Sequence, residues 1–322
     1  MGGLRHATAV LAASVVATFM LLAATPAHAG FDLGLAATDN YGILYEGNGG
    51  NTLSFNNSTE VGNIGTGNTG KFQGNGPGTI TGNIDFSAAN TGQFSNSGLT
   101  INGSVNYSVS NVTTALNTVN TLSHDLGLEA GTSTTISSGG SINASSGTLD
   151  AGGNRVFTVT SINFPNGTFT INGTGSDFVV LNIAGSVGSN GLNGSVVLAG
   201  GITADQVLFN FTPDTSVLTT YNNDYTNLSG GPTMTISNNG VATAGVFLDP
   251  TGPFQVNHSG PITGRVIGGD THNSSFVSGG NLITPTNEVT VIPEPATLLL
   301  VGTVFAGLGA WGRKRLFGKT AV

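Results

Sequence analysis

Short stretches in which hydrophobic and polar residues alternate recur along most of the chain. In 104–109, single polar residues separate Val105, Tyr107 and Val109, so these three side chains would share one face of a β-strand. Two other stretches, 178–183 and 207–211, are apolar except for one asparagine each, which is typical of central strands buried on both faces. The pattern predicts a mainly β body.

In a second pattern, a β-branched pair of positions is followed by glycine. It occurs at 79–84, 100–105, 170–173 and 261–266. Because glycine permits a sharp change of direction, short strands with glycine corners favour a β-solenoid, whose coils bury their side chains against neighbouring coils. The spacing of the pattern is irregular, and an antiparallel β-sandwich is the alternative.

Residues before about Phe72 are rich in glycine and asparagine, and they suit either irregular coils or a mobile arm.

One segment has helical periodicity. Ser110 or Asn111 can cap its start and Gly127 can end it, so we expect one long helix at about 111–127, packed along the β body. The apolar residues that recur three or four positions apart and predict this helix are Val112, Ala115, Leu116, Val119, Leu122 and Leu126.

The N-terminus has the pattern of an export signal. An apolar stretch from Ala7 to Ala24 is followed by Ala27-His28-Ala29, an Ala-x-Ala site for signal peptidase immediately before Gly30. We therefore predict that residues 1–29 are a signal peptide.

The C-terminus combines three features in order. Pro293-Glu294-Pro295 keeps the chain extended, because proline fixes φ and removes a backbone donor. The apolar residues 296–311 would form a helix of roughly 24 Å, at the short end of what crosses a bilayer. The cluster Arg313-Lys314-Arg315 would stay in the cytoplasm, which leaves the residues before Pro293 outside.

This arrangement resembles the PEP-CTERM sorting signal of Gram-negative bacteria. The resemblance implies that an exosortase recognises and cleaves residues 291–322. The transmembrane helix would then hold the protein in the inner membrane only transiently, before residues 30–290 reach the cell surface or the extracellular space. The alternative is an anchor that is never cut.

From about Val112 to Phe276, the order of landmarks resembles the choice-of-anchor A family of bacterial surface proteins. The landmarks are the helix ending at Leu122-Ser123, the strands 179–185 and 207–211, the stretches 245–250 and 264–269, and His272. The family usually has Ala-Pro where this chain has Asp249-Pro250, and it brings no catalytic residues. The body also looks similar, at the level of fold, to the β-solenoid of bacterial ice-binding and adhesion proteins, in which a long helix lies beside the coils.

The charge of the body excludes nucleic acid as a partner. Residues 30–292 contain 15 acidic residues and only 3 basic ones, Lys71, Arg155 and Arg265, so the surface repels phosphates. The chain has no cysteine, which excludes disulfides and thiolate metal sites.

No group of residues predicts catalysis, a metal site or a cofactor. Asp270 and His272 are the nearest approach to a ligand pair, and they lack a third ligand. The Gly-x-Gly-x-x-Gly match at 307–312 lies inside the predicted membrane helix, where it cannot bind a dinucleotide.

An extracellular polysaccharide-active enzyme would need two carboxylates roughly 5 to 10 Å apart. The acidic candidates are Asp150, Asp177, Asp205, Asp214, Asp224, Asp249 and Asp270.

Threonines occur in Thr-x-Thr pairs at 158–160, 168–170 and 233–235. In an unbroken ladder on a flat face they would order water or contact ice; otherwise they are ordinary outward-facing strand residues.

Taken together, these patterns predict an exported protein without enzymatic activity that is sorted by an exosortase. Its predicted role is structural or adhesive, at the cell surface or in the exopolysaccharide matrix of a biofilm. Ice binding and a polysaccharide-active enzyme are the alternatives.

Overall fold

The computed structural model describes residues 30–89, 91–188, 191–214, 231–238, 241–269, 272–277 and 281–285. They belong to one compact unit, residues 28–287. Apart from the pair β11–β12, the paired strands in these ranges run parallel. The mainly β prediction is confirmed, and the parallel pairing rules out the antiparallel sandwich.

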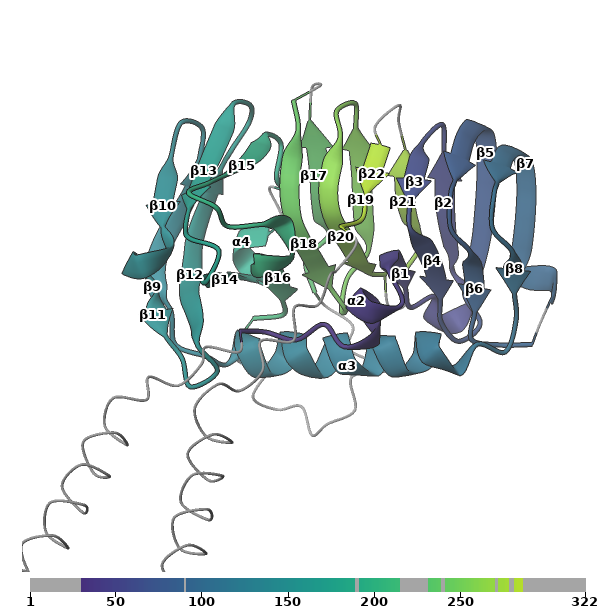
Figure 1. The fold of residues 1–322 in the computed structure, drawn as a ribbon, viewed down its shortest axis with the longest axis horizontal. Helices are drawn as coiled ribbons and strands as arrows, with labels where there is room; N and C mark the ends of the chain where they lie inside the picture. Colours follow the sequence, from purple (N-terminus) through teal and green to yellow (C-terminus); the bar gives the residue numbers. More distant parts are fainter. Residues whose placement is uncertain are drawn as a thin grey trace, which may run out of the picture. The chain divides into compact units, whose positions relative to one another are not determined.

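The strands stack into coils with three sides (Figure 1). The side that faces the long helix α3 (Ser110–Gly127) is called the helix sheet. Its strands, in spatial order, are β9 (Thr132–Ser137), β12 (Asn154–Asn163), β14 (Phe178–Ala184), β16 (Val207–Thr212), β18 (Thr243–Asp249), β20 (Ile262–Gly268), β1 (Tyr41–Tyr45), β4 (Asn63–Thr66), β6 (Ile84–Phe86) and β8 (Val105–Asn106).

The second side is called the threonine sheet. It begins with β10 (Ser141–Asn143), β13 (Thr168–Asn172) and β15 (Ser195–Ala199). It continues with the first residues of β18 and β20, then β22 (Asn281–Ile283), β3 (Thr59–Val61) and the last residues of β5 (Lys71–Ile80) and β7 (Phe94–Ile101). The two parts meet where the Val196 amide donates a hydrogen bond to Thr243 Oγ1 at 2.8 Å.

The third side is called the amide sheet. Its strands are the last residues of β9 and β12, then β17 (Met234–Asn238), β19 (Phe254–His258), β21 (Ser274–Val277), β2 (Thr52–Asn56) and the first residues of β5 and β7. The remaining elements are β11 (Thr148–Leu149), α2 (Leu35–Thr38), α4 (Gly185–Gly188) and the 3-10 turns η1 (Asn48–Gly50), η2 (Thr91–Gln93), η3 (Ala144–Ser146) and η4 (Ala204–Gln206).

The order of the coils in space differs from their order in the sequence. Strands β1 to β8 form one end of the stack, α3 then runs back along the helix sheet, and β9 to β22 return toward the first coil (Figure 1). The last coils dock on the first one, where β20 pairs with β1 (Ile43 opposite Val266) and β22 pairs with β3 (Thr59 opposite Asn281). The stretch before Phe72, for which irregular coils or a mobile arm were predicted, therefore forms regular coils in the middle of the stack.

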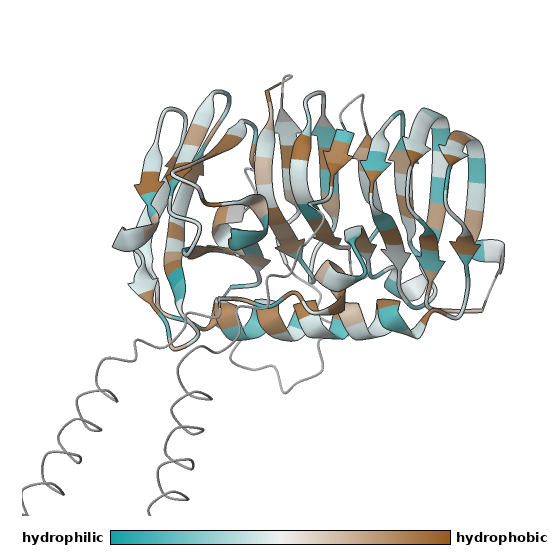
Figure 2. Cartoon of the chain, viewed as in Figure 1, coloured by the Kyte–Doolittle hydropathy of each residue, from teal (hydrophilic) through white to brown (hydrophobic). Residues whose placement is uncertain are grey.

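The hydrophobic residues form a core inside the coils and a second cluster between the helix sheet and α3. Figure 2 shows the hydrophobic positions of the strands and of α3 in brown. In β14, Val179 and Leu181 point into the coils while Val180 packs in the helix cluster, so the strand is buried on both faces as its sequence indicated. The helix occupies the segment in which its periodicity placed it. Its N-cap is Val109, without a side-chain cap, so the capping expected from Ser110 or Asn111 is wrong.

The alternating stretch 104–109 is only partly a strand. β8 contains two residues, Val105 and Asn106, because Ser108 adopts a positive φ of 61° that turns the chain toward the helix. Tyr107 packs against the coil core, whereas Val109 packs in the helix cluster. The three side chains therefore do not share one strand face.

The glycine pattern marks the corners between the threonine and helix sheets, as predicted. Glycines at this corner stack from coil to coil, and the Gly82 amide donates to Gly62 O at 3.1 Å. A Cβ on Gly82 would lie 2.2 Å from Gly62 O, and one on Gly103 would lie 2.3 Å from Gly82 O. Only glycine permits this close approach of the backbones.

The asparagines that interrupt the two apolar runs fasten the helix to the sheet. Asn182 and Asn210 are opposite each other in β14 and β16, and Asn210 Nδ2 donates to Asn182 Oδ1 at 2.9 Å. Asn210 Nδ2 also donates to Ser123 O at 2.9 Å, and Asn182 Nδ2 donates to Leu126 O at 2.6 Å. Ser123 Oγ donates to Asn210 Oδ1 at 2.5 Å. Leu126 O, one of the last carbonyls of the helix, thus accepts from Asn182 as well as from the Glu129 amide at 3.1 Å.

A buried arginine joins the last coils to the first one. The fully buried Arg265 donates to Ala36 O at 3.0 Å, Tyr41 O at 2.7 Å and Pro285 O at 3.1 Å, and its Nε lies 3.3 Å from Asp205 Oδ1. Burial lowers the pKa of Arg265, although the Asp205 carboxylate opposes that shift. The side chain thus connects segments that lie far apart in the sequence.

Candidate binding surfaces

The threonine sheet carries a ladder of three threonines on its outer surface. Thr59, Thr79 and Thr100 occupy directly paired positions of neighbouring strands, and Asn281 extends the ladder on the other side of Thr59. Between paired strands the spacing is about 4.8 Å, and outward residues two positions apart in one strand are about 6.6 Å apart. The ladder is therefore a regular row of hydroxyl and methyl groups.

Apolar side chains lie next to this ladder. Ile283 and Val61 face each other across β22 and β3 and are 40% and 39% exposed. Val197, which is 39% exposed, lies farther away, on β15 in the other part of the threonine sheet. Thr263 is paired with Ile283 in the same row. The surface alternates hydroxyls with exposed methyls, and it contains no exposed aromatic ring among the described residues.

The amide sheet has a different outer surface. One row runs Ser237, Asn257, Val277, Asn56, Asn75, Ser97, and the next runs Thr235, Gln255, Ser275, Ser54, Gln73, Ser95. Within the first row, Asn75 Nδ2 donates to Asn56 Oδ1 at 2.9 Å. Apart from Val277, these positions present uncharged groups that both donate and accept hydrogen bonds.

Charge is confined to other parts of the described fold. The outward positions of both open sheets carry one charged residue within the described strands, Lys71 at the start of β5. Arg155 lies on the helix sheet, and Glu60 points into the interior. The other described acidic residues lie on the helix sheet, on or beside the helices, or in turns that adjoin them. Two sides of the coil stack are therefore nearly uncharged.

The predicted Thr-x-Thr pairs do not form one ladder. Thr158 lies in the helix sheet, Thr168 and Thr170 lie in the threonine sheet, and Thr235 lies in the amide sheet. The observed ladder comes instead from the glycine-corner motif, which supplies Thr79 and Thr100. The motif is present in the sequence, but the sequence alone does not show that its threonines are neighbours across strands.

The described candidate carboxylates mostly hold turns. Asp150 accepts hydrogen bonds from the amide and Nδ2 of Asn154 at 2.7 and 2.8 Å, and Asp177 Oδ2 accepts from the Thr174 amide and Oγ1, both at 2.8 Å. Asp214 Oδ1 accepts from the amide of Ser186 at 3.1 Å. Burial raises the pKa of Asp205, while its partner Arg265 opposes that shift. Asp249 Oδ2 accepts from the Met234 amide at 3.1 Å.

The other predicted site residues fall mostly outside the described ranges. Asp224 and Asp270, the signal-peptidase residues Ala27 and Ala29, the membrane helix 296–311 and the sorting residues from Pro293 to Arg315 all lie there. Gly30 is described, and its amide donates to Gly152 O at 3.1 Å. His272 is exposed, and its backbone carbonyl accepts a hydrogen bond from the Tyr45 hydroxyl at 2.9 Å.

The described residues contain no group of three potential metal-ligating His, Cys, Asp or Glu side chains. Within the same ranges, no helix has both the length and the apolar character that a membrane crossing requires.

Residues 291–314 match the PEP-CTERM protein-sorting motif. The match implies an exported protein that an exosortase processes and sorts to the cell surface. The roles of Pro293, Glu294, Pro295 and the basic cluster within it stay predictions. No curated protein matches the chain, and the resemblance to the choice-of-anchor A family stays a prediction.

The chain is similar to several solved structures. One is an ice-binding protein from an Antarctic biological consortium, with 13% identity, a TM-score of 0.49, and coverage of 81% of this chain and 94% of the other. Another is an ice-binding protein from an Arctic yeast, with 14% identity, a TM-score of 0.48, and coverage of 80% and 95%. A third is the DUF3494 domain of a Shewanella frigidimarina ice-binding protein, with 11% identity, a TM-score of 0.48, and coverage of 80% and 98%. What those proteins bind is a property of their own surfaces.

Proposed function

We propose that the exported body of this protein binds ice through its threonine sheet. The observation that carries this proposal is the uncharged outer surface on which Thr59, Thr79 and Thr100 form a ladder beside the exposed methyls of Val61 and Ile283. Ice is an uncharged lattice of repeating water molecules. A surface that matches it needs groups at fixed intervals, not ionic groups.

The chemistry of threonine suits this task. Its β-branched side chain is stiff at χ1, so a strand holds the hydroxyl and the methyl in one orientation and little entropy is lost on binding. A charged side chain would keep its own tightly held water, and removing that water is costly. The lack of charge on this sheet is therefore as important to the proposal as the hydroxyls.

Two variants of strand β5 test the assignment, because Thr79 faces out from the threonine sheet and Gln73 faces out from the amide sheet. The measurement is thermal hysteresis of residues 28–287, the compact unit. We expect wild-type protein to show hysteresis, Thr79→Tyr to lose most of it, and Gln73→Tyr to retain it. Absence of hysteresis in the wild type, or equal activity in all three proteins, would refute ice binding by this sheet.

The amide sheet favours a second candidate function, adhesion to a neutral polysaccharide of the extracellular matrix. Its stacked asparagine, glutamine and serine side chains offer hydrogen-bond donors and acceptors without charge. The same variants test it, with the opposite expectation. Gln73→Tyr should lower retention on exopolysaccharide from the producing cells, and Thr79→Tyr should not.

Export and release are tested on the native protein. The proposal expects a species in the medium or at the cell surface that begins at Gly30 and ends near Pro293, identified by intact mass. Only full-length protein in the membrane fraction, ending at Val322, would show a permanent anchor and would contradict sorting by an exosortase.

A further inference from the structure

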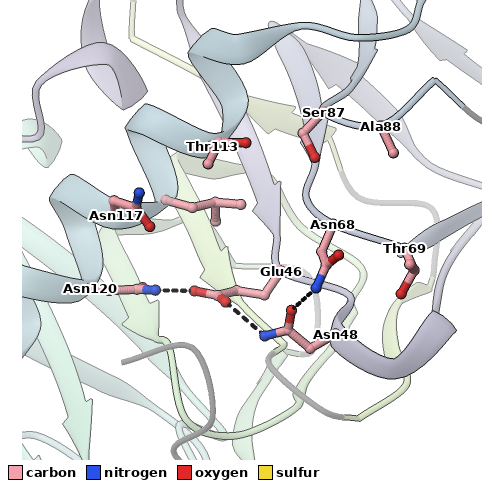
Figure 3. Close-up of a pocket in the computed structure, with 10 residues that line it drawn as sticks. Glu46, Asn48, Asn68, Thr69, Ser87, Ala88, Thr113, Asn117 and Asn120 are labelled. Atoms are coloured by element: carbon pink, nitrogen blue, oxygen red, sulfur yellow. Dashed lines mark hydrogen bonds between the residues drawn. The ribbon is translucent and has the colours of Figure 1, made fainter. Parts of the chain in front are cut away.

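A polar pocket lies away from both open sheets, between α3 and the first coils. Three turns line its coil side, following β1, β4 and β6, and each leads from the helix sheet toward the amide sheet (Figure 3). On the other side, α3 contributes Thr113, Asn117 and Asn120, which are three or four residues apart and so lie along one face of the helix. The volume is about 380 Å³, within the range of small-molecule sites.

A chain of hydrogen bonds organises the polar groups of the pocket (Figure 3). Asn68 Nδ2 donates to Asn48 Oδ1 at 2.7 Å, and Asn48 Nδ2 donates to Glu46 Oε2 at 3.3 Å. Asn120 Nδ2 donates to Glu46 Oε1 from the helix side. Because the carboxylate needs a donor, the Asn120 amide cannot flip without placing its oxygen against a negative charge.

The orientation of Asn120 leaves an acceptor unsatisfied. Its side chain is 3% exposed, and its Oδ1 has no hydrogen-bond partner among the described residues. A buried acceptor without a donor costs free energy, because it has lost its hydrogen bonds to water. A ligand that donates a hydrogen bond at this point would remove that cost.

We propose that this pocket binds a neutral sugar unit, such as the end of an extracellular polysaccharide chain. A sugar hydroxyl donates to Asn120 Oδ1, while Asn117 and Thr113 offer amide and hydroxyl groups that both donate and accept. Anionic sugars and phosphates are disfavoured, because Glu46 is 5% exposed and none of the residues lining the pocket is cationic. The site is separate from the threonine ladder, so ice binding and sugar binding can fail independently.

Two variants at the mouth of the pocket probe it without disturbing the core. Asn117 is exposed and Ala88, in the turn after β6, is half-buried, so Asn117→Leu and Ala88→Phe should fold. Thr121→Val is the matched control, since Thr121 is exposed on the same helix and is not among the lining residues. Circular dichroism melting curves confirm that each variant is folded.

The assay is saturation-transfer difference NMR on the full chain in a detergent without a sugar headgroup. Glucose, galactose, mannose and N-acetylglucosamine are titrated separately. We expect saturable binding of at least one of them, at least tenfold weaker binding in Asn117→Leu and Ala88→Phe, and no change in Thr121→Val.

Three results would overturn the proposal. One is the absence of saturable transfer to any of the four sugars. The second is binding that persists in Ala88→Phe, which would place the sugar on another surface. The third is that CaCl₂, titrated by calorimetry, binds the wild type but not Ala88→Phe while the sugars do not bind, which would make the pocket a cation site.

Discussion

Raising the pH is expected to weaken the junction between the first and last coils, because Glu60 is a carboxyl group with no exposure to water. It lies in β3 and points inward, where Oε1 accepts a hydrogen bond from Thr284 Oγ1 at 2.8 Å and Oε2 has no hydrogen-bond partner in the part of the chain that the structure describes. Burial raises its pKa from 4.5 to about 8, while the bond from Thr284 and the charge of Arg265 partly oppose the shift. The folded protein therefore holds this proton more tightly than the unfolded chain.

The sign and size of the effect follow from that difference in pKa. The stabilising effect of the proton is complete below pH 4.5 and is lost as the pH rises through about 8. A shift from 4.5 to about 8, at about 1.36 kcal/mol per pKa unit, corresponds to at most about 5 kcal/mol of unfolding free energy.

The assay is urea unfolding of residues 28–287 at several pH values between about 5 and 9. Glu60→Gln has no proton to lose, so its stability should fall much less over this range than that of the wild type, and it should be the more stable protein at the alkaline end. Glu129→Gln, an exposed residue after α3, is the control and should follow the wild type. Parallel pH profiles for wild type and Glu60→Gln would refute the reasoning.

Other substitutions test the contacts that hold the fold together. Asn210→Leu removes the partner of Ser123 Oγ and of Asn182 Oδ1 and should lower the unfolding free energy by roughly 2 to 4 kcal/mol, measured by urea unfolding. Gly42→Ala should also destabilise, because the new Cβ would lie 2.0 Å from Glu60 Oε1; a melting temperature equal to that of the wild type would contradict this. Arg265→Met leaves buried carbonyls and Asp205 unpaired and should cost about 3 to 5 kcal/mol. In that variant, faster hydrogen exchange should appear first in β1, β20 and β22.

The sequence indicated the local structure because its periodicity is local. Buried strands such as β14 and β16 and the residues of α3 follow from hydrophobic spacing alone. The joining of β1 to β20 could not be predicted in this way, because Ile43 and Val266 become neighbours only after α3 has carried the chain back along the stack. Arg265 was counted as a surface charge in the sequence, yet it is fully buried.

The threonine ladder shows a similar limit. Thr59, Thr79 and Thr100 stand 20 and 21 residues apart, and this spacing is informative only when the length of a coil is known. Thr-x-Thr pairs were easier to see, but their members are divided among three sheets. The pocket beside Asn120 had no sequence signal, since its residues come from three turns and a helix that the coil stack brings together.

Partition into growing ice tests the central claim most directly. The chain has no cysteine, so Glu129→Cys, placed beside the helix and away from both open sheets, allows wild-type and Thr79→Tyr proteins to carry different dyes in one solution. We predict that slowly grown ice will take up the protein with the intact ladder and leave the Thr79→Tyr protein in the liquid. Equal exclusion of both proteins, or equal uptake, would contradict the claim that the threonine sheet binds ice.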